Sequence, residues 1–178
     1  MFMSLIRNRR SIRSFSDKEI EPEKIALLIE AALRSPSSRS LNPWEFVLVR
    51  DKGMLDQLSS SKPHGATFLK HAPLGIVVLA DPKKCDVWVE DASIASTYIQ
   101  LAAENLGLTS CWIQIRNREF GPGKMACEQV ADLLNIPAHI EVESIIAIGY
   151  PVDSLPGHPK ESLDYTKVHD GIYGKNFS

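Results

Sequence analysis

The spacing of hydrophobic residues along the chain predicts helices that alternate with strands. From Ile25 to Leu33, apolar residues recur with the 3.6-residue period of a helix, and Pro22 suits the first helical position. This helix ends at Ser35, because a residue before proline disfavours the helical conformation. The uninterrupted apolar run at residues 74–80, which Asp81 closes, predicts a central strand that is buried on both faces.

The longest predicted helix covers residues 90–106 and is apolar on nearly every side. Gly107 stands in the position that commonly ends a helix. A helix of this kind is either a core helix of one chain or part of a subunit interface, and both explanations remain open from composition. Small residues that would permit close approach of another helix are Ala92, Ala95, Ser96, Ala102 and Ala103.

The remaining elements follow the same reasoning and give a mixed order of helices and strands. Gly121 to Lys124 is interpreted as a turn before a helix. The tail at residues 151–178 is rich in proline and glycine but carries enough apolar residues to dock, so we predict that it wraps over another surface. The order predicts one sheet with helices on both faces. Further helices are expected at 4–9, 52–60, 64–71 and 124–134, and further strands at 44–50, 109–115 and 144–150.

Length and composition predict a single globular domain, residues 1–178, with a core at 1–150 and an extended arm at 151–178. The longest uncharged apolar run is too short to cross a bilayer, and no signal peptide is recognised. The odd cysteine count indicates free thiols in a reducing compartment, so a cytoplasmic location is expected. The histidines show no metal-ligand spacing, and no dinucleotide-binding glycine motif occurs, so no metal site is expected.

The segment from Arg9 to Arg13 places three guanidinium groups and a hydroxyl within five residues of a chain whose net charge is −2. Guanidinium groups bind phosphate oxygens in pairs and stay charged at physiological pH, so this segment is a candidate phosphate site. The alternatives are a solvated basic turn and a nucleic-acid-binding arm. The chain has no other basic stripe, and Phe15 is expected to pin the turn to the body, which argues against both.

Three more segments carry polar residues at the ends of predicted elements: residues 35–44, 110–116 and 158–160, the last shortly after the strand end at 148–151. Each alone is an ordinary loop. Together with the arginine segment, in this order, they resemble the nitroreductase family of FMN-dependent oxidoreductases. The resemblance covers nearly the whole chain and depends on the motifs RRSxRxF, PSSxxxxPW, LGLxSCWI and IGYP.

The resemblance implies a layered α+β fold with a central, mainly antiparallel sheet flanked by helices. It also implies an intertwined homodimer with the flavins at the interface and the C-terminal arm on the partner. The interface interpretation of helix 90–106 is then the favoured one. The other implied partner is a small electron acceptor, with neither nucleic acid nor membrane involved.

The resemblance also assigns roles in FMN binding. Arg9 and Ser11 would hold the phosphate and ribityl chain, and His158 and Lys160 would bring further positive charge. Arg13 would reach the pyrimidine edge of the ring, and the backbone N–H of Gln114 would point at flavin N5. The serine loop, residues 36–42, would come from the other subunit. The full expected set is Arg9, Arg10, Ser11, Arg13, Pro36, Ser37, Ser38, Ser40, Asn42, Trp112, Ile113, Gln114, His158 and Lys160.

The implied activity is hydride transfer from NAD(P)H through FMN to electron-poor acceptors such as nitroaromatics or quinones, with no catalytic acid or base from the protein. The chain departs from the family pattern at Ser40, Asn42, residues 114–116 and the histidine and lysine of the tail. Open alternatives are another flavin reaction on the same fold (dehydrogenase, reductive dehalogenase or flavin-cleaving enzyme) and a non-enzymatic flavin- or phosphate-binding protein.

Overall fold

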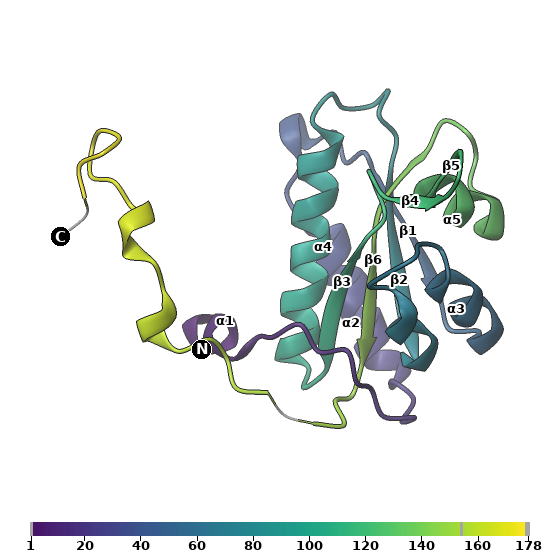
Figure 1. The fold of residues 1–178 in the computed structure, drawn as a ribbon, viewed down its shortest axis with the longest axis horizontal. Coiled ribbons are helices and arrows are strands. Elements are labelled where there is room, and N and C mark those ends of the chain that lie inside the picture. The colour runs from purple at the N-terminus through teal and green to yellow at the C-terminus, as the bar shows by residue number, and fades with distance from the viewer. Residues whose placement is uncertain (1, 154, 177–178) are drawn as a thin grey trace.

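A computed structural model describes residues 2–153 and 155–176. Within these residues the main sheet has four strands in the order β1 (Trp44–Val49), β2 (Leu74–Ala80), β6 (Glu141–Gly149) and β3 (Thr109–Gln114) (Figure 1). Every neighbouring pair is antiparallel. The expected antiparallel sheet is therefore confirmed, with β3 as an edge strand.

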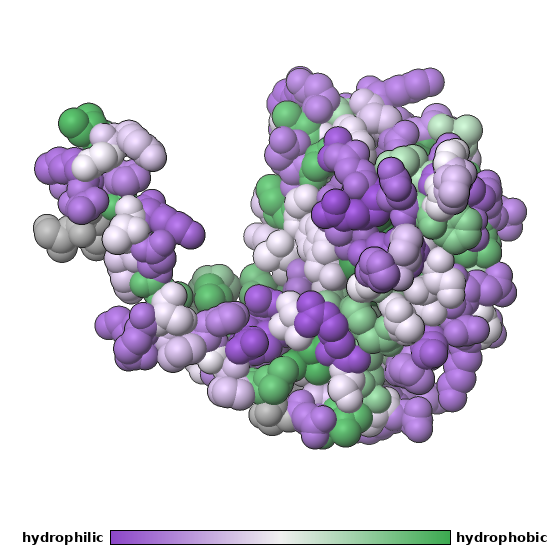
Figure 2. Space-filling view, viewed as in Figure 1, coloured by the Kyte–Doolittle hydropathy of each residue, from purple (hydrophilic) through white to green (hydrophobic). Residues whose placement is uncertain are grey.

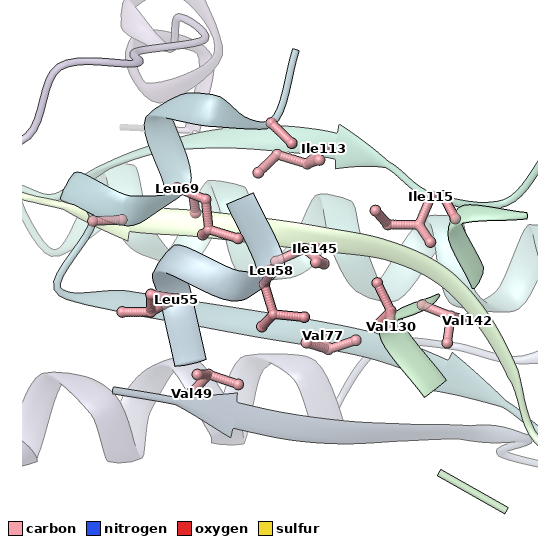
Figure 3. Packing of buried hydrophobic residues seen from close by; sticks show 14 of the residues in the cluster. Val49, Leu55, Leu58, Leu69, Val77, Ile113, Ile115, Val130, Val142 and Ile145 are labelled. Atoms are coloured by element: carbon pink, nitrogen blue, oxygen red, sulfur yellow. The ribbon is translucent and has the colours of Figure 1, made fainter. Parts of the chain in front are cut away.

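Helices cover both faces of this sheet, as predicted. Two helices, α2 (Pro22–Leu33) and α4 (Trp88–Asn105), pack on one face with Ile146 and Ile148 of β6. The other face is covered by α3 (Lys52–Ser59), the 3-10 helix η2 (Thr67–His71) and α5 (Ala126–Leu134), whose Leu58, Leu69 and Val130 meet Ile113 and Ile145 (Figure 3). The site residues of β3 therefore lie on a strand whose side chains are anchored in both layers.

The central strands are buried because their side chains are apolar on both sides. All seven residues of β2 are buried, which confirms the prediction from its apolar run. Leu58, Leu69 and Ile145 have no exposed surface. Burying each such side chain contributes about 1.5–3 kcal/mol, so this layer fixes the position of β3 firmly.

Three predicted boundaries are wrong. Residues 124–125 do not begin the helix that follows but form β5 (Lys124–Met125), which pairs with β4 (Glu119–Gly121), so the glycine-rich turn closes a hairpin. The predicted helix at 64–71 is limited to the 3-10 turn η2. The last strand begins at Glu141, three residues before the predicted start, because it pairs with β2 across a bulge.

The α4 helix is not buried all round within one chain. Its residues Ala95, Ile99 and Ala103 are fully buried against the sheet, whereas Ile94 and Tyr98 are 38% and 40% exposed. A helix that is wholly internal to one chain is therefore excluded. The exposed apolar side agrees with the interface interpretation, as do the exposed apolar residues of α1 (Phe2–Asn8).

The tail leaves the body after passing α1 and contains two 3-10 turns, η3 (Lys160–Ser162) and η4 (Tyr165–Lys167) (Figure 1). Figure 2 shows hydrophobic side chains scattered along the tail, which stands clear of the body. Large apolar residues of the tail, among them Leu163 and Ile172, are exposed. Residues 154, 177 and 178 of the predicted arm lie outside the described part, and its docking on a partner stays a prediction.

Candidate flavin site

The arginine segment follows α1 and lies along the open edge of β3. The backbone N–H of Ile12 donates to the carbonyl oxygen of Ser110 at 3.1 Å, and Ser11 forms a parallel bridge with the same residue. Phe15 is buried and bridges Pro151, so the expected anchoring of this segment by Phe15 is confirmed. The fold thus places the guanidinium groups beside the strand that carries the other predicted flavin contacts.

The backbone of Gln114 is directed to this open edge. The N–H of Ile115 donates to the carbonyl of Glu143 on β6, so Ile115 bonds to the neighbouring strand. Along an antiparallel pair such as β3 and β6, residues that bond to the neighbouring strand alternate with residues that face away from it. Gln114, the preceding residue, therefore turns its N–H and carbonyl away from β6. The Lys62 ammonium donates to that carbonyl at 2.9 Å, which agrees with this direction.

Lys62 contacts the candidate site through the Gln114 carbonyl, and sequence reasoning missed it. It follows α3 in a polar segment and is half-buried. Burial lowers its pKa, and the nearby Arg118 lowers it further. It faces β3 only because the chain after α3 folds back over the strand end, and no local pattern signals this contact.

Several cations converge on this edge around the buried thiol of Cys111. Burial raises the pKa of Cys111, while the charges of Arg13, Arg9 and Lys62 act in the opposite direction. The Arg13 guanidinium also lies over the Phe68 ring, 5.8 Å from its centroid. Converging cations of this kind favour an anionic ligand such as a phosphate, and they stabilise negative charge that develops on a bound ring.

The side chain of Gln114 is held against the protein rather than presented to solvent. Its Oε1 accepts from Trp112 Nε1 at 2.9 Å, and its Nε2 donates to Glu143 Oε1 at 3.2 Å and to the Arg116 carbonyl at 3.1 Å. Glu143 is 3% exposed, and burial raises the pKa of its carboxyl. The group that Gln114 offers at the edge is therefore its backbone N–H.

The serine loop has an unusual backbone. Arg39, Ser40 and Asn42 have φ values of 54°, 54° and 46°, in the left-handed region that costs roughly 1–2 kcal/mol per non-glycine residue. Ser37 Oγ holds both ends of the loop, since it accepts from Asn42 N at 2.9 Å and donates to Asn42 Oδ1 at 2.7 Å. Pro36 is exposed at its start.

The serine loop and the arginine segment lie at opposite ends of α4. Ser38 N donates to Asp91 Oδ1, in the first turn of α4. Glu104 lies in the last turn; burial raises its pKa, and the nearby positive charge of Arg9 acts in the opposite direction. Glu104 is thirteen residues after Asp91, a distance of about 20 Å along the helix at 1.5 Å per residue. Within one chain the serine loop therefore lies far along α4 from the Arg9 end of the arginine segment.

The start of the tail is fastened to the arginine segment. Arg10 Nη1 donates to the Pro156 carbonyl at 2.9 Å. Gly157 lies so close to α1 that a Cβ there would stand 1.6 Å from the Arg7 carbonyl oxygen. His158 and Lys160 follow directly and are exposed. Arg10 thus faces the tail in this chain, on the rim of a cavity of about 360 Å³ that Glu104 also lines.

Two larger cavities lie away from this edge. One of about 610 Å³ borders α5 at Cys127, and one of about 590 Å³ lies between Ile20 and His71. No predicted flavin contact lines either of them.

The comparisons with known proteins agree with this geometry. The chain belongs to the nitroreductase family, whose model matches residues 6–62 and 52–150. A solved FMN-dependent nitroreductase from Clostridium difficile R20291 is 46% identical with a TM-score of 0.94, and the match covers 96% of this chain and 99% of that one.

Two further relatives extend this comparison. A protein of Archaeoglobus fulgidus with the provisional name NADH dehydrogenase/NAD(P)H nitroreductase is 39% identical over 155 residues, 85% of this chain and 86% of the relative. An FMN reductase (NADPH) of Bacillus subtilis is 26% identical over 96% of this chain and 74% of its own length. The predicted family, its oxidoreductase class and the fold are confirmed, and the predicted cofactors, FMN and NAD(P)H, are those named for these relatives.

In the described part of the chain, none of the helices combines the length and the apolar character that a membrane span requires.

Proposed function

We propose that this protein is an FMN-dependent NAD(P)H oxidoreductase that reduces electron-poor acceptors such as nitroaromatics or quinones by a ping-pong mechanism. The observation that carries the proposal is the edge of β3, where the Gln114 N–H points outward among cations. When bound there, FMN supplies hydride transfer through its N5, from the nicotinamide to an acceptor that occupies the same place afterwards.

The residues of the edge divide into three roles. Arg9 and Ser11, at the start of the segment beside β3, hold the phosphate and the ribityl chain. Arg13 holds the pyrimidine side of the ring. Its fixed positive charge favours the reduced flavin, which carries more negative charge than the oxidised flavin. The Gln114 N–H is held at one place by the Lys62 bond to the carbonyl of the same residue, and it donates toward N5.

A second copy of this chain completes the site. The serine loop lies about 20 Å along α4 from the arginine segment of its own chain, so we assign it to the flavin held by the other copy. The exposed Ile94 and Tyr98 of α4 supply an apolar surface for the contact between copies. The tail, with its exposed Leu163 and Ile172, packs on the partner and brings His158 and Lys160 to a phosphate.

The cations after β3 favour acceptors with a negative group. Arg116 lies over the Trp88 ring, 5.5 Å from its centroid. Arg118 is close enough to Lys62, which bonds the Gln114 carbonyl, that its charge adds to burial in lowering the pKa of Lys62. This observation keeps open a second candidate on the same fold, reduction of an anionic aromatic substrate such as a halogenated one. A panel that pairs neutral quinones with carboxylated and halogenated aromatics distinguishes the two by kcat/KM.

The test is direct. Purified protein is expected to be yellow, to bleach when NADH or NADPH is added without oxygen, and to recolour when a quinone follows. A yellow sample that neither nicotinamide bleaches would contradict the proposed reaction while leaving flavin binding intact. A colourless sample that stays colourless after incubation with FMN would contradict both.

A further inference from the structure

Asp91 is a buried acid that joins three segments of the chain. It lies in the first turn of α4 and is 2% exposed. Its Oδ1 accepts the backbone N–H of Ser38 at 2.8 Å, and its Oδ2 accepts the thiol of Cys85 at 3.2 Å. Both oxygens are therefore used, one of them by the serine loop.

The serine loop needs such an anchor because its backbone is unfavourable by itself. Three of its residues adopt left-handed φ values, and the bonds between Ser37 and Asn42 lie within the loop. The ion pair from Arg39 to Asp86 is exposed and contributes little. The bond from Ser38 to Asp91 differs, because its acceptor is buried and belongs to α4.

We propose that Asp91 is a positioning residue that holds the loop Ser37–Asn42 in the shape in which it covers the FMN of the second copy. The inference rests on the proposed function. A loop that is already ordered before binding loses less entropy when the cofactor arrives, so affinity rises. Because Asp91 belongs to α4, which carries the exposed apolar side, the same helix sets the loop relative to the neighbouring copy.

Two pairs of variants separate the anchoring bond from other effects. Asp91→Ala removes both acceptors, whereas Asp91→Asn keeps an oxygen for Ser38 N–H and serves as the conservative rescue. Ser38→Pro deletes the donor, and Ser37 is already extended (φ −136°, ψ 157°), as a residue before proline prefers. Ser38→Ala keeps the N–H and is its control. Loss of a bond to a charged group predicts about tenfold to hundredfold weaker FMN retention in Asp91→Ala and Ser38→Pro.

Mixed dimers show whether the anchor acts across the interface. In a dimer of one Arg9→Ala subunit and one Asp91→Ala subunit, both defects fall on the same site if the loop serves the other copy. The second site is then intact, and one FMN per dimer is retained with wild-type affinity. When both substitutions are in one subunit and its partner is wild type, each site has one defect, and neither retains FMN normally.

Each outcome bears on a separate claim. The reverse pattern, with the intact site in the dimer whose substitutions share a subunit, would overturn the assignment of Asp91 to the neighbouring flavin. Wild-type retention in both Asp91→Ala and Ser38→Pro would overturn the anchoring role alone, while wild-type protein that binds no FMN would overturn the proposed function as well. If Asp91→Ala does not fold, Ser38→Pro replaces it in the mixed dimers.

Discussion

Replacing Lys62 by methionine removes one charge and one hydrogen bond from the edge of β3. The ammonium donates to the Gln114 carbonyl at 2.9 Å, and the half-buried stem lies beside the strand end. Methionine keeps the length of the side chain but cannot donate this bond. We expect the variant to fold and bind FMN but to reduce it less readily, because reduction adds negative charge that the ammonium stabilises.

The size of the effect follows from the charge that is removed. At an effective dielectric constant of about 20, a unit charge roughly 8–16 Å from the charge added on reduction contributes about 1–2 kcal/mol. For a two-electron couple, about 1.4 kcal/mol corresponds to about 30 mV. The FMN potential of Lys62→Met is therefore expected to lie roughly 20–40 mV below that of the wild type.

Equilibration with reference dyes under anaerobic reduction measures this potential. Lys70→Met is the matched control, because Lys70 is an exposed lysine at the end of η2 and its loss changes the net charge equally. We expect the control to stay within a few millivolts of the wild type. Equal potentials for all three proteins, or equal shifts in both variants, would refute the placement of Lys62 at the flavin.

Three further predictions follow from named contacts. Arg13→Ala should lower the flavin potential while retention persists, whereas Arg9→Ala should mainly weaken retention; potentiometry and FMN titration giving the inverse pattern would refute these roles. The pKa of Glu21 is lowered to about 2, first of all by the hydrogen bond that Tyr150 donates to its carboxylate. Ionised Glu21 therefore stabilises the fold fully above its ordinary pKa of 4.5, and this stabilisation is lost as the pH falls through about 2. The Tm advantage of wild type over Glu21→Gln should therefore shrink between pH 6 and pH 2.5, and a constant difference would contradict it. In Gly157→Ala the new Cβ would meet the Arg7 carbonyl, so the tail should separate from α1 and be cut faster by proteases. Gly121→Ala is the control, because the space around Gly121 is open.

The sheet could be predicted from the sequence where one strand is buried on both faces. Leu74 to Ala80 is a continuous apolar run closed by an acid and a proline, and the strand has these bounds in the structure. The short strand Lys124–Met125 could not be predicted, because two polar or flexible residues carry no periodic signal. Its existence depends on pairing with Glu119–Gly121.

The site was predictable where its residues form a continuous motif, and it was missed where a distant segment contributes. The arginine segment is visible as charge density within five residues, and the structure places it beside β3. Lys62 is a single lysine in a polar stretch, and Asp91 reads as an ordinary acid in the first turn of a helix. Both gain their roles from hydrogen bonds to residues more than fifty positions away in the chain. The periodic spacing of hydrophobic residues carries no information on such contacts.

Native mass spectrometry of the purified protein tests the central claim most directly. In the proposed arrangement the cations of one copy and the serine loop of another enclose each flavin, so a dimer that carries two FMN and loses them when it separates is predicted. A monomer that carries FMN at full occupancy, or a dimer that takes up none when FMN is added in excess, would contradict it.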